Sequence, residues 1–535
     1  MLKREFSGYG FAKLMKDLLA GLTVAAVALP LALAFGVSSG ADAAAGLITA
    51  IIAGVVMSTL SGASFQISGP TGAMSAILVT IVAKHGLQGV FSVCFIAGII
   101  LLLCGIFRLG KLIALIPRPV ITGFTSGIAV IIALGQIDNF FGTKSVGDSA
   151  VAKLISYGSL GFVPHVGTLL LGLIVVAIMI LYPKKWNAKV PSSLVGLIVS
   201  TVVYVIFRFD GVATVGAIPK SLFADTRFSL ASFDFGSIST LLPSAITVAA
   251  LGMIESLLCG ASASRMKNES FDADIELVAQ GVGNIIIPFF GGVPATAAIA
   301  RTSVAIKSGA ETRLTGIFHA LWILAVMFLF GDIMKLIPLS ALGGVLIVTA
   351  WRMNEWSAIK YMFSKKFVGA MLQFFVTMIA TVVFDLTVAI VIGVLFSIFT
   401  FVKNAANLTV SASVVDESRI VGRGNIGKGH KESLVVYITG TIFFADTNTL
   451  IDEVAKLPDS REIIFSLRGV PNIDTTGIQV FTDIYRELNA KGVKVLFCGM
   501  NGAVSKVFRQ SGLYELVGNE NFYWSVDKAL LDDAE

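Results

Sequence analysis

Apolar runs of roughly 20 residues recur along the chain from about residue 17 to residue 403, and short polar segments separate them. About 20 apolar residues are needed for one helix to cross the hydrocarbon core of a bilayer. The pattern therefore predicts a bundle of membrane-spanning helices. The fourteen predicted segments are 17–37, 44–62, 71–84, 88–107, 112–137, 166–183, 191–208, 243–260, 275–290, 295–308, 314–336, 338–352, 368–384 and 386–403.

Two of these segments, 71–84 and 295–308, are too short to cross a membrane. Each offers about 13 helical residues, which span roughly 20 Å. Each begins in a stretch punctuated by Gly and Pro, "SGPTG" in one and "GGVPAT" in the other. Because non-helical backbone at membrane depth is tolerated only where it is packed in protein or lines a cavity, both breaks are predicted to lie inside the protein.

The two short segments are the third and the tenth, so they hold equivalent places in two halves of seven. A repeat unit with an odd number of crossings inverts its topology in the membrane. Paired breaks in such repeats are typical of transporters whose binding site lies at the broken helices. We therefore expect a 7+7 inverted repeat of 14 segments with its site between segments three and ten.

The hydropathy changes after Lys403, where strand-like and helix-like segments alternate. Strands are predicted at 433–439, 441–445, 462–469 and 493–500, and helices at 445–457, 475–492 and 501–516. This alternation predicts a small α/β domain with a partly parallel sheet. The predicted divisions are a cytoplasmic N-terminus (1–16), a transmembrane transport domain (17–403), a linker (404–430) and the α/β domain (431–535).

Composition and charge support a membrane protein. Hydrophobic residues make up 55% of the chain and charged residues 14%, against about a quarter charged in average globular proteins. Lys and Arg outnumber Asp and Glu by 27 to 17 in residues 1–403, and they gather in alternate loops. The positive-inside rule then places both termini in the cytoplasm. This basic charge is no sign of nucleic-acid binding, and the four cysteines have no spacing typical of a metal site.

Four motifs, in order along the chain, resemble the SulP/SLC26 family of anion transporters: "GLTVAAVALPLALAFGVSSGADAAAGL", "SGPTGAMSAI", "GGVPATAAIARTSVAIKSGAETRLTGI" and "NIDTTG". The resemblance covers essentially the whole chain. It implies an α-helical membrane domain with a mobile core and a gate, followed by a cytoplasmic STAS domain. It also implies a homodimer, elevator-like alternating access and a substrate held between segments three and ten.

The beginnings of two half-helices suit an anion, because a helix N-terminus presents unpaired N–H groups and about half a positive charge. Small residues at these positions let a ligand approach the backbone closely. Phe35 is included because the resemblance places an aromatic residue at the substrate there. The predicted substrate-binding residues are Phe35, Thr71, Gly72, Thr296, Ala297, Ala298, Ala300 and Arg301.

Arg301 follows the second break by about two turns, and helical side chains lean toward the helix N-terminus. An Arg at mid-membrane costs roughly 2.5–3.5 kcal/mol on insertion scales, so a role at the site is expected. Two alternatives stay open. In the first, Arg301 reaches the cytoplasmic surface from a short helix. In the second, Arg301 lies at the anion site, where it either contacts the anion directly or adds its charge from behind the helix start.

Glu255 is an acidic residue well inside an apolar segment, "AITVAALGMIESLLCG". A carboxyl group in that setting is a candidate proton-binding site, and a structural carboxyl is the alternative. Proton-coupled sulfate and dicarboxylate members of the resembled family carry Glu here, whereas sodium-coupled bicarbonate members carry Asp with a Thr four residues later. This chain has Cys259 at that place and keeps only Thr71 of the sodium-site hydroxyls. The resemblance therefore favours H⁺ over Na⁺ as the coupling ion, with no other cofactor.

The motif "NIDTTG" matches the strand-to-helix turn at which related bacterial STAS domains are phosphorylated on a hydroxyl. Thr475 and Thr476 are the possible phosphoacceptors, since a helix N-terminus favours a dianion. The alternative is a plain helix cap made by Asp474 and Thr475.

The predicted function is secondary active transport of a small oxyanion, bicarbonate or dicarboxylate, with proton symport, in a bacterial cytoplasmic membrane. No catalytic or metal centre is expected; the partners are the anion, membrane lipid, a second copy of the chain and a possible cytoplasmic regulator of the STAS domain. The alternatives are a sodium-coupled bicarbonate importer, an anion exchanger and, in another class, a membrane signalling receptor. A nucleobase transporter is disfavoured because a neutral base does not call for the charge of Arg301.

Overall fold

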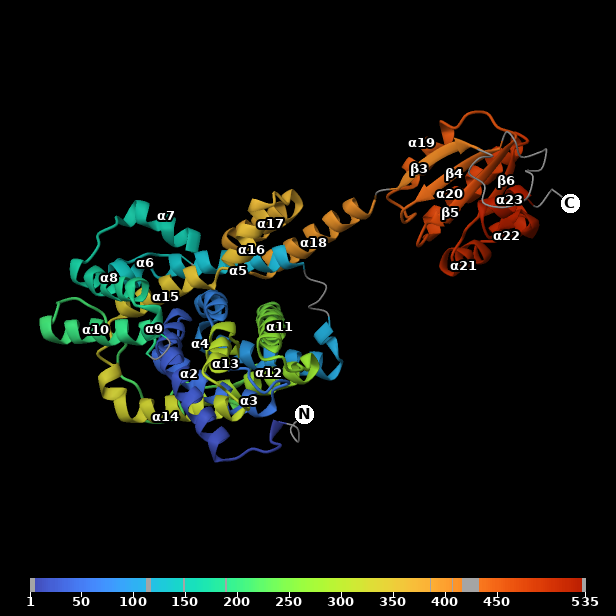
Figure 1. Ribbon diagram of the computed structural model, residues 1–535. Coiled ribbons are helices and arrows are strands. Elements are labelled where there is room, and N and C mark those ends of the chain that lie inside the picture. Colours follow the sequence, from blue (N-terminus) through green and yellow to red (C-terminus); the bar gives the residue numbers. More distant parts are fainter. Residues whose placement is uncertain are drawn as a thin grey trace. The chain divides into compact units, whose positions relative to one another are not determined.

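The computed structural model describes residues 5–111, 117–147, 150–187, 190–384, 386–406, 408–415 and 433–531 (Figure 1). The chain forms two compact units, Met1–Leu395 and Phe396–Glu535. The first unit is helical and the second contains the α/β sheet. The helices up to the end of the apolar region are α2 (Phe11–Ser38), α3 (Ala43–Leu60), α4 (Gly72–Ile106), α5 (Arg118–Gly135), α6 (Ile137–Phe141), α7 (Ala150–Leu160), α8 (Val166–Leu181), α9 (Lys184–Asn187), α10 (Ser192–Phe207), α11 (Ile238–Lys267), α12 (Ala273–Ile286), α13 (Ile299–Lys307), α14 (Leu314–Met334), α15 (Leu339–Met353), α16 (Trp356–Ser364), α17 (Val368–Val383) and α18 (Leu386–Ala405).

Each of the fourteen predicted segments overlaps a helix of the described chain, although residues 112–116 lie outside the described residues and residues 296–297 form a short strand. Seven helices of the described chain are long and apolar enough to cross a membrane, and five others are apolar but shorter. Segments three and four form the single element α4, which is interrupted by a non-helical backbone at Gly86 (φ 66°). The number of crossings stays a prediction, while the helical membrane fold agrees with the pattern.

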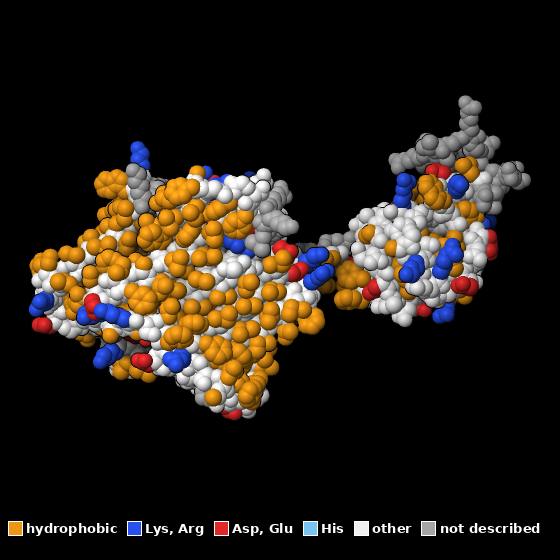
Figure 2. Space-filling model, turned by 90° about the horizontal axis from the view of Figure 1, so that it is seen from below, with side chains coloured by type: hydrophobic (Ala, Val, Ile, Leu, Met, Phe, Trp, Pro, Cys, Tyr) orange, Lys and Arg blue, Asp and Glu red, His pale blue; other side chains and the backbone are white. Residues whose placement is uncertain are grey.

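Apolar side chains cover the outside of the helical unit, as Figure 2 shows. Leu181 and Leu329 are more than 70% exposed, at 78% and 75%. Large exposed apolar surfaces on a helical bundle are what a hydrocarbon solvent requires. The space-filling view therefore agrees with a membrane-embedded unit.

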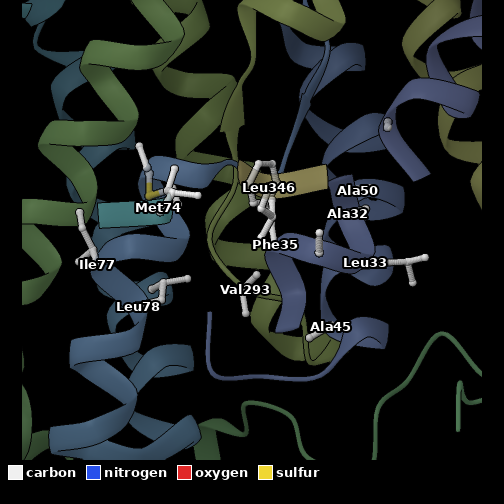
Figure 3. Close-up of a cluster of buried hydrophobic side chains, with 14 of the residues drawn as sticks. Ala32, Leu33, Phe35, Ala45, Ala50, Met74, Ile77, Leu78, Val293 and Leu346 are labelled. Carbon is white, nitrogen blue, oxygen red and sulfur yellow. The ribbon is translucent and has the colours of Figure 1, made fainter. Parts of the chain in front are cut away.

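The helices of this unit pack as two groups. One group contains α2, α3, α4, α11, α12, α13 and α14, and the other contains α5, α6, α8, α10, α15 and α17. We call them the core group and the gate group. Small residues allow close helix contacts in the core group: a Cβ placed on Gly46 of α3 would stand 1.9 Å from the carbonyl oxygen of Ala32 in α2. Figure 3 shows the buried apolar side chains between these elements, including Phe35, Met74 and Val293.

The second unit contains a five-stranded sheet in the order β3-β4-β5-β6-β7. Its strands are β3 (Thr409–Val414), β4 (Leu434–Thr439), β5 (Glu462–Gly469), β6 (Lys494–Cys498) and β7 (Phe522–Tyr523), and its helices are α19 (Thr447–Ala455), α20 (Thr475–Ala490), α21 (Gly502–Gln510), α22 (Leu513–Val517) and α23 (Val526–Leu531). β3 is antiparallel to β4, and the other neighbours are parallel. The predicted partly parallel sheet is confirmed.

Three details of this unit differ from the prediction. Residues 441–445 form no strand, because only Ile442 bridges to Ile473 there and the segment turns into α19. β3 lies inside 404–430, the range predicted as a linker. The edge strand β7 and the helix α23 were not predicted, because the segments that form them have only two and six residues.

Candidate functional site

The two breaks in the apolar pattern meet at one point of the core group. β1 (Ser68–Gly69) pairs antiparallel with β2 (Thr296–Ala297), with Gly69 opposite Thr296. α4 begins directly after β1, and α13 begins directly after β2. The pairing therefore brings the N-termini of both half-helices close together, one at each end of the short ladder.

The two helix starts differ in their caps. Thr71 caps α4, and its hydroxyl oxygen accepts a hydrogen bond from the N–H of Met74 (3.4 Å). Ala298 precedes α13 and offers no side-chain acceptor. The first N–H groups of α13 therefore keep their capacity to bind an anionic ligand. The helix begins at Ile299, so α13 has nine residues rather than the predicted 13 or so.

A cavity of about 460 Å³ lies at these helix starts. Seven of the eight predicted substrate-binding residues line it, as does Glu255: Phe35, Thr71, Gly72, Ala297, Ala298, Ala300 and Arg301. Thr296 does not line it. Its hydroxyl is fully buried and bonds to the Ser256 hydroxyl (2.7 Å) and the Gly252 carbonyl (3.3 Å) of α11, so Thr296 holds β2 against α11.

Arg301 is the most unusual side chain at the cavity. The residue is 1% exposed, and its three guanidinium nitrogens have no hydrogen-bond partner among the described residues. The guanidinium lies against Gly69, since a Cβ at that glycine would stand 2.6 Å from Nη1. Arg301 therefore stays inside the protein, behind β1, and does not extend to the surface as the alternative would require. A buried charge without a partner costs several kcal/mol, so its retention points to a ligand of opposite charge.

Glu255 comes from α11 and meets the first half-helix. Its carboxylate accepts a hydrogen bond from the Thr71 hydroxyl (2.9 Å). Glu255 and Arg301 line the same cavity, yet none of the ion pairs between described residues joins them. The site thus places one carboxyl and one cation near two helix N-termini without letting the two charges neutralise each other directly.

The opposite wall of the cavity comes from the gate group and was not foreseen. α5 contributes Ile121, Phe124, Thr125, Ile128 and Ile132, and the chain at and after the end of α15 contributes Leu346, Thr349, Ala350, Arg352, Met353, Asn354 and Glu355. The apolar members of this set are ordinary for a membrane helix, so no sequence signal marks them, whereas Arg352 and Glu355 add a second cation and a second carboxyl to the cavity lining. Gly69 could have been singled out, because a glycine next to the break leaves the space that the guanidinium occupies.

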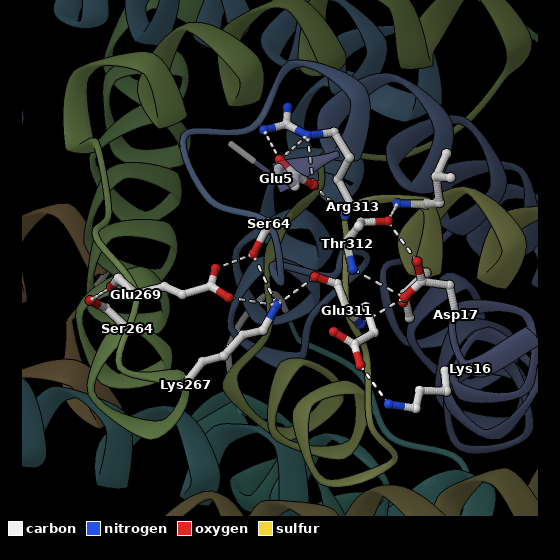
Figure 4. Close-up of polar contacts among 12 residues, drawn as sticks. Glu5, Lys16, Asp17, Ser64, Ser264, Lys267, Glu269, Glu311, Thr312 and Arg313 are labelled. Atoms are coloured by element: carbon white, nitrogen blue, oxygen red, sulfur yellow. Dashed lines mark hydrogen bonds and ion pairs between the residues drawn. The ribbon is translucent and has the colours of Figure 1, made fainter. Parts of the chain in front are cut away.

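A polar network holds the far end of α13 (Figure 4). The fully buried carboxylate of Asp17 accepts hydrogen bonds from the N–H groups of Glu311 (2.7 Å) and Thr312 (3.1 Å). It also accepts hydrogen bonds from the hydroxyls of Thr312 (2.6 Å), Thr315 (2.8 Å) and Tyr9 (2.8 Å). The start of α2 is therefore fastened to the turn that follows the half-helix bearing Arg301.

Arg313 extends the same network. Its guanidinium pairs with the buried carboxylate of Glu5 (2.9 Å) and also donates to the carbonyl oxygens of Thr59 (2.8 Å) and Ser61 (3.3 Å). Its acceptors come from two segments, the N-terminal segment and the end of α3. The contrast with Arg301 is clear, because one buried arginine is fully paired and the other is not.

Replacing Asp17 with Ala is expected to destabilise the folded protein by about 3 kcal/mol, since it leaves buried N–H and O–H donors without an acceptor. Thermal unfolding of the purified protein in detergent measures the effect. Lys16→Ala is the matched control: it removes an exposed ion pair to Glu311 (2.7 Å), and such pairs contribute about 0–1 kcal/mol. Equal melting temperatures for the two variants would contradict the role of Asp17.

In the second unit, Asp474 caps α20. Its carboxylate accepts hydrogen bonds from the N–H groups of Gly477 (2.7 Å) and Phe444 (3.1 Å). Thr475 and Thr476 are the first two residues of α20, and Thr475 is exposed. The cap is thus made by Asp474, and phosphorylation of either threonine stays a prediction.

Comparison with known proteins gives concordant results. Residues 14–380 match the sulfate permease family, and residues 424–529 match the STAS domain. YvdB of Bacillus subtilis, which is provisionally named a sulfate transporter, is 33% identical over 532 residues, covering 97% of this chain and 98% of YvdB. The bicarbonate transporter BicA of Picosynechococcus sp. is 28% identical over 540 residues, covering 97% and 94%.

Solved structures agree with the fold. The transmembrane domain of a cyanobacterial bicarbonate transporter BicA has a TM-score of 0.66 at 30% identity, covering 71% of this chain and 98% of that domain. The murine anion transporter Slc26a9, in its inward-facing state, has a TM-score of 0.83 at 17% identity, covering 97% and 92%. At that identity, the second likeness shows the fold alone.

The fold and the cavity define a polytopic membrane transporter with a C-terminal STAS domain. The chain belongs to the sulfate permease family, SulP/SLC26. The resemblance inferred from the four sequence motifs is thereby confirmed.

Proposed function

We propose that this protein carries a small anion across the membrane and binds it between the N-termini of α4 and α13. The unpaired, buried guanidinium of Arg301 is the observation that carries the proposal. A full positive charge behind two helix starts suits a sulfate-class oxyanion, bicarbonate or a dicarboxylate. The names of YvdB and BicA, a sulfate and a bicarbonate transporter, support the same class of substrate.

Transport is coupled to protons through Glu255 in this proposal. When Glu255 is ionised, its charge offsets that of Arg301 across the cavity and competes with the anion. When a proton neutralises Glu255, the charge of Arg301 is available to the anion, so proton and anion load together. The hydrogen bond from Thr71 to Glu255 (2.9 Å) supports this coupling, because it links the carboxyl group to the first half-helix.

Sodium coupling has less support. The thiol of Cys259, which stands where sodium-coupled relatives are expected to carry Thr, contacts the hydroxyl of Thr302 (3.3 Å) and is a poor ligand for a hard cation. Exchange of one anion for another is the third possibility. The three modes predict different driving forces, so one assay separates them.

The remaining features follow from the family and from the two helix groups. The core group carries both half-helices, and the gate group supplies the opposite wall. We take the core to move against the gate in an elevator-like cycle, in a homodimer in a bacterial cytoplasmic membrane, with both termini in the cytoplasm.

Uptake by the full-length protein in liposomes tests the proposal. Labelled sulfate, bicarbonate and succinate are presented with an inward proton gradient, an inward sodium gradient or internal unlabelled anion. Electroneutral symport with one proton accumulates a monoanion about tenfold per pH unit, and symport with two protons accumulates a dianion about a hundredfold. If only a sodium gradient or only internal unlabelled anion drives accumulation, the protein is a sodium symporter or an exchanger and proton symport is wrong. If none of the three anions enters, the proposed substrate class is wrong.

A further inference from the structure

A second cavity of about 500 Å³ lies in the helical unit. It is bounded by α2, α4 and α11 of the core group and by α5, α6, α7 and the end of α17 on the other side. Its charged and titratable lining residues are Lys84, His85, Asp138 and Lys153. We call it the basic cavity, and the cavity at Arg301 the site cavity.

One side chain, that of Ile132, lines both cavities, and no other described residue does. The residues of α5 show why. Ile121, Phe124, Ile128 and Ile132 recur at helical spacing along the wall of the site cavity. The next residues, Gly135 and Gln136, line the basic cavity.

Ile132 is packed tightly at this crossing. The residue is 4% exposed. A Cβ placed on Gly72 would stand 2.5 Å from Ile132 Cδ1 and 3.1 Å from Phe35 Cε1. Gly72 is the first residue of α4, so Ile132 from the gate group and Phe35 from the core group together cover the start of the half-helix.

Each of the two cavities that Ile132 lines has polar residues in its lining, whereas the contact of Ile132 with Gly72 is apolar. Gln136, which lines the basic cavity, donates a hydrogen bond to the Ser38 hydroxyl of α2 (3.3 Å). Thr71 and Glu255 lie on the side of the site cavity. A short apolar constriction between two cavities that each contain polar groups excludes hydrated ions, because ions cross it only by losing water that apolar groups cannot replace.

From this geometry we infer that Ile132 is the barrier that separates the two cavities and keeps an anion from crossing without a transport cycle. The gate group supplies this side chain, which lines both cavities. The inference rests on the proposed function for the identity of the ion. It does not depend on proton coupling.

Ile132→Ala tests the barrier in liposomes loaded with chloride, with the membrane potential set by valinomycin and potassium. Passive chloride efflux is expected to rise at least about tenfold above that of wild type, because removing three carbons connects the two cavities. Ile132→Val should give a smaller increase. Ile131→Ala is the matched control, since Ile131 lines only the basic cavity, and its efflux should stay within about twofold of wild type.

Efflux from Ile132→Ala and Ile132→Val equal to that of wild type would overturn the inference, provided that one of the two variants melts near the wild-type temperature. An equal rise in the Ile131→Ala control would also overturn it, since the leak would then not be specific to the shared side chain. The test is separate from that of the proposed function. If wild type accumulates no anion but chloride efflux from Ile132→Ala rises, the proposed function fails and the barrier stands. If wild type accumulates anion but chloride efflux from Ile132→Ala does not rise, the barrier fails and the proposed function stands.

Discussion

Arg301→Gln is expected to lower anion transport about a hundredfold while the protein without anion melts at the same or a higher temperature than wild type. The guanidinium is buried and has no partner among the described residues, so its charge lowers the stability of the folded state. Its removal relieves that cost. Stability and function are thus expected to move in opposite directions, as at other binding sites built with strain.

The expected loss of anion affinity follows from the hydrogen bonds that the Arg301 guanidinium donates to the anion. Two charge-assisted hydrogen bonds to an anion contribute about 3 kcal/mol or more, which corresponds to roughly a hundredfold in affinity. Uptake at sub-saturating anion should therefore fall about a hundredfold, and the rise in melting temperature caused by the anion should vanish. Arg301→Lys keeps the charge without the planar fork and should retain part of both.

Arg313→Gln is the matched contrast. Arg313 is equally buried, but Glu5, Thr59 and Ser61 satisfy its guanidinium. Removing a partner from a buried pair costs about 3–5 kcal/mol, so this variant should melt at a lower temperature. If Arg301→Gln instead destabilises the protein as Arg313→Gln does, Arg301 is a structural residue and the proposed site is wrong.

Glu255→Gln is expected to remove the response to a proton gradient and to leave exchange of anion across the membrane. The amide oxygen of Gln can still accept the hydrogen bond from Thr71, and Gln resembles the protonated acid in shape and charge. The variant is therefore locked in the state that admits the anion. Wild-type uptake should rise as the outside is acidified, whereas uptake by the variant should stay constant.

Glu276→Gln controls for the loss of a buried carboxylate. Glu276 is fully buried in α12, where it accepts hydrogen bonds from the Ser61 hydroxyl (2.6 Å) and the Gly62 N–H (3.1 Å). It does not line the site cavity. Its replacement should lower the melting temperature and keep proton-driven uptake; undiminished proton-driven uptake in Glu255→Gln would rule out Glu255 as the coupling group.

Much of the fold could be read from local patterns. Hydropathy located the long apolar helices, because burial in lipid requires long apolar runs whatever their partners. The short helices α7, α9 and α16 lie outside the predicted segments. The positions of the two breaks, and of Arg301 behind the second one, followed from Gly, Pro and a charge inside apolar runs. The α/β alternation after residue 430 identified β4, β5, β6 and α20 for a similar reason, since buried parallel strands are continuous apolar runs.

The errors lie where neighbours distant in the sequence decide the conformation. Thr296 and Ala297 were expected at a helix start, but they form β2 because Ser68 and Gly69 lie within reach and offer backbone partners. The same pairing turns Thr296 away from the cavity. Residues 441–445 have the composition of a strand, yet the sheet is already complete beside β4, so they form a turn.

The order of apolar, small and charged residues thus specifies which segments enter the membrane, where two of them break, and which charge lies behind a break, because each of these depends on the chemistry of a short stretch. Packing between distant segments specifies the rest. It leaves Arg301 beside Gly69 without a partner among the described residues, places Thr71 against Glu255, and sets Ile132 between two cavities. These relations depend on distances between helices, and no short stretch of the chain contains both partners.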